Sequence, residues 1–127
     1  MASFSDAELN YLNGERRLGR LATADADGLP HVVPVGMWRY NHQLGTIDVT
    51  GADFAASRKF RNVQENPKAA FVVDDMASID PWRPRFVMVR GRAEAIDRTP
   101  DGGRALIRLF ADTIVSMGLE LTAAPEK

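Results

Sequence analysis

The chain has 127 residues, a length that fits one domain able to bury a hydrophobic core without disulfides or a structural metal. It contains no cysteine, which excludes thiol catalysis, cysteine-ligated metals and a disulfide framework. Its 16 basic and 17 acidic side chains give a net charge of -1, which argues against a nucleic-acid-binding protein.

No stretch has the apolar character of a signal peptide or a membrane-spanning helix. We therefore expect a single domain over residues 1–127, located in the cytoplasm and without contact to a membrane or to nucleic acid.

The N-terminal part of the chain predicts one helix and two strands. Ser5 and Glu8 have the spacing of a capping box, so a helix is expected from residue 5 to about Gly14. The apolar period changes to two over residues 17–23, which predicts a strand followed by a turn at residues 25–28. Residues 30–40 are predicted as the returning strand, and Pro34 places it at an edge or a bulge, or beside something other than a strand.

A basic helix is expected in the middle of the chain. Residues 44–50 predict a third strand, after which the helix is expected to begin near Asp53 and to end at residues 66–67. Its buried side is expected to consist of Phe54, Ala56, Phe60 and Val63.

The remaining chain reads mainly as strands. Residues 68–73 predict a strand ended by Asp74 and Asp75, and residues 76–84 a loop. Residues 85–96 predict the longest strand. Two more strands are expected at residues 104–110 and 113–119, and the first of these segments also fits a short helix. The last six residues are expected to be frayed. About six antiparallel strands with two short helices predict a mainly β fold, a closed or nearly closed barrel.

The junction of the third strand with the basic helix predicts an anion-binding site. Amides in the first turn of a helix lack intrahelical acceptors, and the helix dipole is positive at that end. Ser57, Arg58, Lys59 and Arg61 add a hydroxyl group and three positive charges. A solvated helix face is the alternative interpretation, but we expect this stretch to hold an anionic cofactor.

Other candidate sites are weaker. His31 and His42 lack the spacing of metal ligands, so no metal site is predicted. Ser57 has no glycine-flanked turn or orienting acid, which argues against a nucleophile. Arg90 and Arg92 are expected to form ion pairs at the surface or between subunits. No residue is assigned as a catalytic acid or base.

Several segments, taken in order, resemble the pyridoxamine 5'-phosphate oxidase-like family, and more narrowly its small deazaflavin (F-420)-dependent branch. They are residues 17–23 (RLGRLAT), 28–36 (GLPHVVPVG), 57–63 (SRKFRNV) with 66–67 (NP), and 80–85 (DPWRPR) with 89–94 (VRGRAE). The resemblance implies an FMN-binding split β-barrel. It also implies a homodimer with cofactor sites at the subunit interface, and hydride transfer to or from a flavin or deazaflavin.

The resemblance further implies cofactor-binding residues. Ser57, Arg58 and Lys59 match the family's phosphate-binding serine and basic pair, and residues 33–37 match the strand that lies along the ring. Trp82 and Arg83 are expected to close over the ring or the substrate. The expected cofactor-binding residues are Val33, Pro34, Val35, Gly36, Met37, Thr50, Gly51, Ser57, Arg58, Lys59, Arg61, Trp82 and Arg83. The match weakens after Ile96, because Asp112 and Met117 stand where family members commonly carry a basic residue and a tryptophan.

The expected function is an oxidoreductase that uses coenzyme F-420 (8-hydroxy-5-deazaflavin) for hydride transfer to a small conjugated organic substrate. A deazaflavin has carbon where a flavin has nitrogen at the reacting position, which favours hydride chemistry. Two alternatives remain open: an FMN-dependent oxidoreductase of the same fold, and a non-catalytic flavin- or deazaflavin-binding protein.

Overall fold

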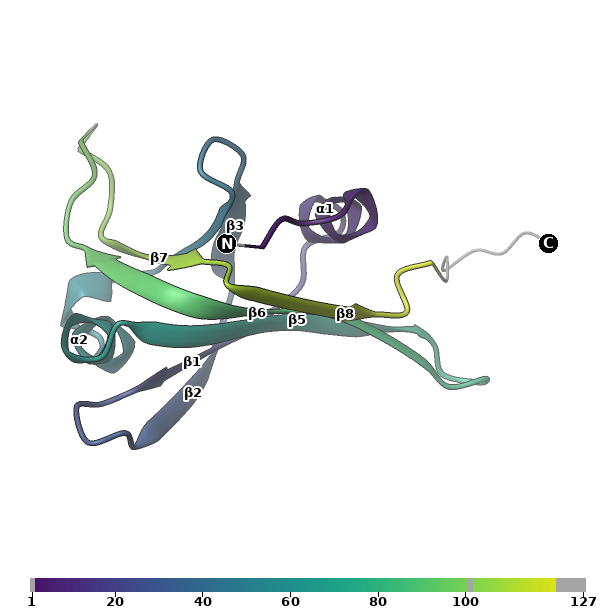
Figure 1. Cartoon of the computed structure of the whole chain (residues 1–127), viewed down its shortest axis with the longest axis horizontal. Coiled ribbons are helices and arrows are strands. Elements are labelled where there is room, and N and C mark those ends of the chain that lie inside the picture. The colour runs from purple at the N-terminus through teal and green to yellow at the C-terminus, as the bar shows by residue number, and fades with distance from the viewer. Residues whose placement is uncertain (1, 101, 121–127) are drawn as a thin grey trace.

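The computed structural model describes residues 2–100 and 102–120 and shows a mainly β fold with two short helices (Figure 1). A single 3-10 turn, η1 (Phe54–Ala56), precedes the second helix. The other elements are α1 (Asp6–Asn13), β1 (Gly19–Ala24), β2 (Pro30–Val35), β3 (Met37–Asn41), β4 (Thr46–Thr50), α2 (Arg58–Glu65), β5 (Lys68–Ser78), β6 (Arg83–Ile96), β7 (Leu106–Phe110) and β8 (Thr113–Met117).

The strands form one antiparallel sheet that curls into a split barrel. Their order is β2-β1-β5-β6-β7-β4-β3. β8 lies outside this order and pairs with residues 86–90 of β6, on the edge opposite β5. β6 belongs to both halves of the barrel, because residues 83–92 pair with β5 and residues 93–96 pair with β7. β2 and β3 lie at the two ends of this order, and only Gly36 separates them in the chain.

The prediction of one returning strand over residues 30–40 is wrong, because that strand divides at Gly36. β2 pairs with β1, whereas β3 pairs with β4. Pro34 lies on an end strand, which is the first of the three positions expected for it. The division contributes to the difference between the six strands expected and the eight found in the described residues.

β5 does not end at Asp74 and Asp75 as predicted, but continues to Ser78, so most of the loop expected at residues 76–84 is strand. The carboxylate of Asp75 accepts hydrogen bonds from Tyr11 Oη (2.9 Å), Arg17 Nε (2.7 Å) and Arg85 Nε (2.6 Å). These contacts outweigh the tendency of aspartate to end strands.

α2 begins at Arg58 rather than near Asp53. Ser57 is its N-cap and accepts a hydrogen bond from the Phe60 amide (3.3 Å). Phe54, Phe60 and Val63 are buried as expected, whereas Ala56 is exposed because it lies in η1, before the helix starts.

The remaining predicted elements are found with small shifts. The capping box of Ser5 and Glu8 is present in α1, and Gly14 follows its last residue. The segment at residues 104–110 contains the strand β7, not a helix. The prediction of frayed terminal residues falls outside the described part of the chain. Neither described helix is long and apolar enough to cross a membrane.

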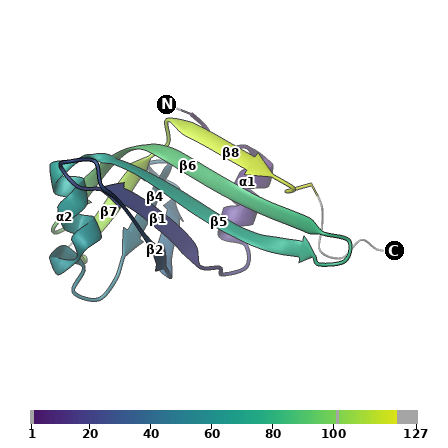
Figure 2. The same cartoon turned by 90° about the horizontal axis from the view of Figure 1, so that it is seen from below.

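The core fills the space inside the barrel, and α2 covers one of its ends (Figures 1 and 2). Phe60 and Val63 of α2 are buried there, and Asn62 Nδ2 donates a hydrogen bond to Thr23 Oγ1 of β1 (3.1 Å). This packing holds the first turn of α2 at the rim of the barrel. The nearly inaccessible core side chains are Leu21, Ile47, Val49, Phe71, Val73, Val87, Val89, Ile107 and Leu109.

Candidate functional site

Met37 and Thr50 bring two of the predicted cofactor-binding segments together. They lie opposite each other in the pairing of β3 with β4, and Gly51 follows Thr50 directly. Thr50 Oγ1 donates a hydrogen bond to the carbonyl oxygen of Ala105 (2.6 Å), which ties the end of β4 to the segment that enters β7.

An open groove of about 650 Å³ begins at Gly51. Residues 51–56 form one wall, and Arg104 and Ala105 form the other. Asp53, in the first of these walls, has a φ of 47°, in the left-handed region, and precedes η1. Arg104 is exposed, and its Nη1 lies 3.9 Å from Met37 Sδ, so a positive charge stands where the groove meets β3.

The groove leads to the positively charged start of α2. Ser57 Oγ donates to the carbonyl oxygen of Phe54 (2.7 Å) as well as accepting from Phe60, so this hydroxyl group already holds the helix start. The amides of Arg58 and Lys59 have no intrahelical acceptor. Lys59 Nζ lies 5.2 Å from the centroid of the Phe54 ring, and the first turn of α2 contains no acidic residue. These features make the helix start suitable for an anion.

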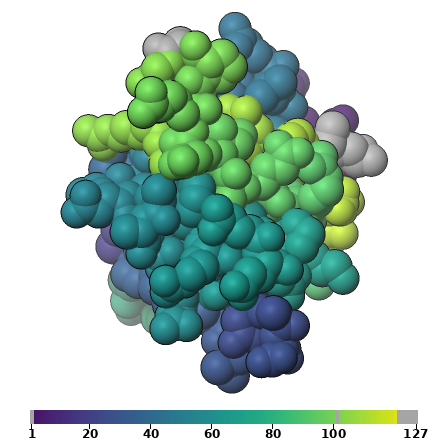
Figure 3. Space-filling view, turned by 90° about the vertical axis from the view of Figure 1, so that its left-hand side faces the viewer, coloured from purple at the N-terminus to yellow at the C-terminus, as the bar shows by residue number. Residues whose placement is uncertain are grey.

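Figure 3 looks at this end of the molecule, where α2 lies between the segment joining β6 to β7 and the turn joining β1 to β2. Arg58 and Arg61 are exposed here, and Lys59 is half-buried. Cationic side chains therefore reach solvent at the same end as the groove.

Residues 33–37 differ in how much surface they offer. Val35 is buried and Val33 is half-buried, whereas Pro34, Gly36 and Met37 are exposed. A Cβ atom at Gly36 would meet nothing closer than Leu18 Cδ2, at 3.7 Å. The three exposed residues therefore offer a ligand the most surface, and Val33 offers less.

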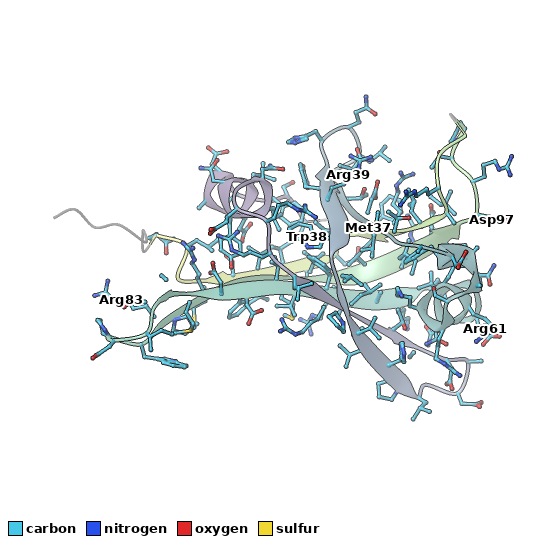
Figure 4. All side chains as sticks on the ribbon, turned by 180° about the vertical axis from the view of Figure 1, so that it is seen from behind. Met37, Trp38, Arg39, Arg61, Arg83 and Asp97 are labelled. Atoms are coloured by element: carbon cyan, nitrogen blue, oxygen red, sulfur yellow. The ribbon has the colours of Figure 1, made fainter. Side chains whose placement is uncertain are left out.

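Trp82 and Arg83 lie far from the groove within one chain. Trp82 belongs to the turn between β5 and β6, and Arg83 is the first residue of β6. Figure 4 shows Arg83 at the end of the molecule opposite Arg61, with Met37 between them. Trp82 is 70% exposed. The structure therefore brings together Met37, Thr50, Gly51 and the start of α2, but not the turn at residues 79–82.

Three arginines that lie near Met37 were not predicted as site residues from the sequence. Arg104 lines the groove, and Arg16 and Arg39 line a second hollow of about 360 Å³ beside Met37 and Thr50. Arg39 and Arg104 are brought together by the pairing of β4 with β3 and β7, and Arg16 joins them through its hydrogen bonds to the carbonyl oxygens of Trp38 and Gly36. No local pattern of residues signals such an arrangement.

Asp48 lines the second hollow and is 4% exposed. Arg108 donates two hydrogen bonds to its carboxylate (3.1 and 3.0 Å), Asn41 Nδ2 one (3.0 Å) and Thr46 Oγ1 one (2.9 Å). Burial raises the pKa of Asp48, but these hydrogen bonds outweigh burial and hold the pKa below its ordinary value. The group is therefore ionised and neutralised by Arg108.

The described residues contain no group of three or more His, Cys, Asp or Glu side chains that could hold a metal ion.

Comparison with known proteins places the chain in a family. The family model described as pyridoxamine 5'-phosphate oxidase matches residues 5–124. The 5a,11a-dehydrotetracycline/5a,11a-dehydrooxytetracycline reductase of Streptomyces rimosus subsp. rimosus is 42% identical over 122 residues, which cover 92% of this chain and 84% of that protein.

Two solved structures share the fold. A FAD-binding protein from Mesorhizobium loti superposes with a TM-score of 0.66 at 19% identity, covering 91% of this chain and 95% of that chain. An F-420 reductase superposes with a TM-score of 0.63 at 22% identity, covering 84% of this chain and 94% of that chain. The resemblance found in the sequence is confirmed: the chain belongs to the pyridoxamine 5'-phosphate oxidase family and is an oxidoreductase with its split-barrel fold.

Proposed function

We propose that this oxidoreductase uses coenzyme F-420 for hydride transfer to a small conjugated organic substrate. One observation carries the proposal: the exposed edge at Met37 and Thr50 continues through a groove to the cationic start of α2. Support comes from the related dehydrotetracycline reductase and from the F-420 reductase of the same fold.

The residues present fit a cofactor that has a flat ring and a phosphate. Arg58, Lys59 and Arg61, with the free amides at the start of α2, would hold the phosphate, and the Ser57 hydroxyl would support this turn. Pro34, Gly36, Met37, Thr50 and Gly51 would face the ring, while Val33 and Val35 support that edge from the interior.

When bound, a deazaflavin supplies or accepts the hydride at a ring carbon. The chain's own contribution is to bind and orient. The cationic groups at residues 58, 59 and 61 would fix one end of the cofactor, and the hollow of about 360 Å³ beside Met37 would hold the second reactant. We assign no side chain as an obligatory acid or base.

FMN is the second candidate, because it requires the same phosphate contacts and because a protein of this fold from Mesorhizobium loti binds FAD. F-420 differs from FMN in carrying an acidic tail. Titration of the cofactor-free protein with each compound separates the two candidates.

We also propose that the chain forms a homodimer through the outer face of β2, β1, β5, β6 and β8, onto which Figure 2 looks. Val32, Val115 and Met117 are exposed on this face, and Val72 and Met88 are half-buried between them. Arg20 and Asp74 form an ion pair on the same face (2.9 Å), so apolar side chains lie there beside charged ones, and exposed apolar patches with polar surroundings mark interfaces. A second copy is also the means by which Trp82 and Arg83, which are remote from their own groove, would reach a cofactor.

The decisive experiment is to purify the protein, identify any bound small molecule by mass and absorbance, and titrate the cofactor-free form with F-420 and FMN. We expect saturable binding, tighter for F-420, and reduction of members of a panel of enones, quinones and tetrapyrroles. Binding of neither cofactor would refute the proposal. Tight binding without turnover of any member of the panel would indicate a cofactor-binding protein.

Sedimentation equilibrium tests the dimer. We expect twice the chain mass of 14.0 kDa for the wild type and a monomer for Val115→Asp with unchanged circular dichroism. A monomeric wild type at micromolar concentration would exclude a stable homodimer.

A further inference from the structure

The hollow of about 360 Å³ beside Met37 lies on the outer face of β3, β4 and β7 and adjoins the groove at Thr50. The strand registers arrange its lining in two rows. Met37 and Thr50, with Leu106 close by, form a mainly apolar wall, whereas Arg39 and Asp48 form a charged one. The hollow therefore offers an apolar surface and a guanidinium group to the same ligand.

Arg39 is not required to neutralise Asp48. Each carboxylate oxygen of Asp48 already accepts two hydrogen bonds, one of them from Arg108. Arg39 Nη2 stays 3.9 Å from Asp48 Oδ2, and the Arg39 side chain is 65% exposed. Its guanidinium group therefore keeps donors that can bind a ligand.

Arg16 adds a second positive charge at the hollow. Its Nη1 and Nη2 donate to the carbonyl oxygens of Trp38 (3.0 Å) and Gly36 (2.6 Å), and its guanidinium carbon lies 5.4 Å from the centroid of the Trp38 ring. These acceptors carry no formal charge, and no carboxylate among the described residues forms an ion pair with Arg16. The hollow is thus lined by two arginines, Arg16 and Arg39, and by one carboxylate, Asp48, which Arg108 already neutralises, so its net charge is positive.

We propose that this hollow is a subsite for the oxyanion of an aromatic or conjugated ligand, a carboxylate or enolate. Arg39 binds the oxyanion through charge-assisted hydrogen bonds, Arg16 adds to the positive potential, and Met37 and Leu106 contact the ring. The assignment of this ligand as the substrate rests on the proposed function. The acidic tail of F-420 is the other source of the same chemistry.

Benzoate and its uncharged analogue benzamide are suitable probes, because they differ at the oxyanion and share the ring. Trp38 lies beneath Arg16, at the wall of the hollow, and isothermal titration calorimetry of the wild type measures the affinity for each probe. We expect saturable binding of benzoate and about tenfold weaker binding of benzamide.

Arg39→Gln should weaken benzoate binding about fivefold or more, whereas Arg98→Gln, a change at another exposed arginine, should not. Equal affinity for the two probes, no saturable binding of benzoate at tens of millimolar, or no effect of Arg39→Gln would each overturn the oxyanion subsite.

Titration of the Arg39→Gln variant with F-420 and with FMN distinguishes the two sources. If the variant binds F-420 more weakly but FMN as tightly as the wild type does, the acidic tail of F-420 occupies the hollow. Unchanged affinity for both cofactors, together with weaker benzoate binding, identifies the substrate. A wild type that binds benzoate but neither cofactor would refute the proposed function and leave the subsite standing.

Discussion

Met37 of β3 lies directly opposite Thr50 of β4, so two chain segments joined by a hairpin meet at the edge where the groove begins. Thr50 is anchored to Ala105 by its hydroxyl group, whereas Met37 projects to solvent. A change at Met37 should therefore affect a ligand in the groove more than it affects the fold.

We predict that Met37→Glu lowers the affinity for F-420 and FMN by about tenfold or more, because a carboxylate at this edge repels an anionic cofactor and disrupts contact with its ring. Leu44→Glu is the matched control, since Leu44 is 47% exposed in the β3–β4 turn and Met37 is 46% exposed. Fluorescence titration measures both variants. Wild-type affinity in Met37→Glu would remove Met37 from the site.

Reversal of charge at the start of α2 tests the phosphate assignment. Arg58→Glu combined with Lys59→Glu should reduce the affinity for both cofactors by about two orders of magnitude, because two charge-assisted contacts become repulsive. Arg98→Glu serves as a control for charge reversal at a single exposed arginine, a change of two charges against four in the double variant. If the double variant retained wild-type affinity for F-420 and FMN, the phosphate would lie elsewhere.

Two substitutions at Ser57 separate helix capping from ligand binding. Aspartate is a good N-cap but brings a negative charge to the helix start, so Ser57→Asp should keep the unfolding free energy within about 1 kcal/mol of wild type while weakening cofactor binding. Ser57→Ala should lose about 1 kcal/mol of stability through the missing cap. Urea unfolding and cofactor titration on the same samples give both quantities. Cofactor affinity of Ser57→Asp equal to wild type would place the anion away from this turn.

Asp75 should make stability depend on pH. Burial raises the pKa of this carboxyl group, but hydrogen bonds from Arg85, Arg17 and Tyr11 outweigh burial and hold it well below its ordinary value. Since the folded pKa is lower than the unfolded value of about 4, the stabilisation is complete above that value and is lost as the pH falls through the folded pKa. Asp75→Asn should therefore reduce the unfolding free energy at neutral pH by about 3 kcal/mol and flatten its fall between about pH 5 and pH 2.

Asp74→Asn is the control for this pH dependence. Asp74 pairs with Arg20 (2.9 Å), and both side chains are about half exposed, so its loss should cost less than about 1 kcal/mol. Urea unfolding at a series of pH values measures both variants. Equal pH profiles for Asp75→Asn and wild type would show that the Asp75 cluster does not stabilise the folded state.

Gly91 lies next to the point where β6 passes from one half of the barrel to the other. A Cβ atom there would collide with the Phe110 carbonyl oxygen and lie 2.9 Å from the Asp112 amide nitrogen. We expect Gly91→Ala to reduce the unfolding free energy by about 3 kcal/mol, whereas Gly36→Ala, which has room for its methyl group, should change it little. Thermal unfolding measures both. A stable Gly91→Ala variant would contradict this close crossing of backbones.

Local patterns in the sequence were sufficient for much of the fold. The capping box of Ser5 and Glu8 predicted α1, and alternation over residues 17–23 predicted β1. Pro34 included an edge strand among the positions it allowed. The cationic helix start was also visible, because Ser57, Arg58 and Lys59 are neighbours in the chain. These features depend on residues a few positions apart, and their physical basis is backbone hydrogen bonding and apolar periodicity.

Only the tertiary structure decided how distant segments meet. The local sequence around Asp75 predicts the end of a strand, but its contacts with Arg17 and Arg85 allow the strand to continue. Residues 30–40 are predicted as one strand, but their two halves pair with different neighbours. The hollow lined by Arg16 and Arg39 likewise exists only once β3, β4 and β7 are assembled. By itself the sequence determined the family, the barrel class and the cationic helix start. The long-range strand pairing of the barrel determined where the groove lies and which arginines surround it. Strand registers bring together side chains that are remote in the chain, and no local pattern encodes those registers.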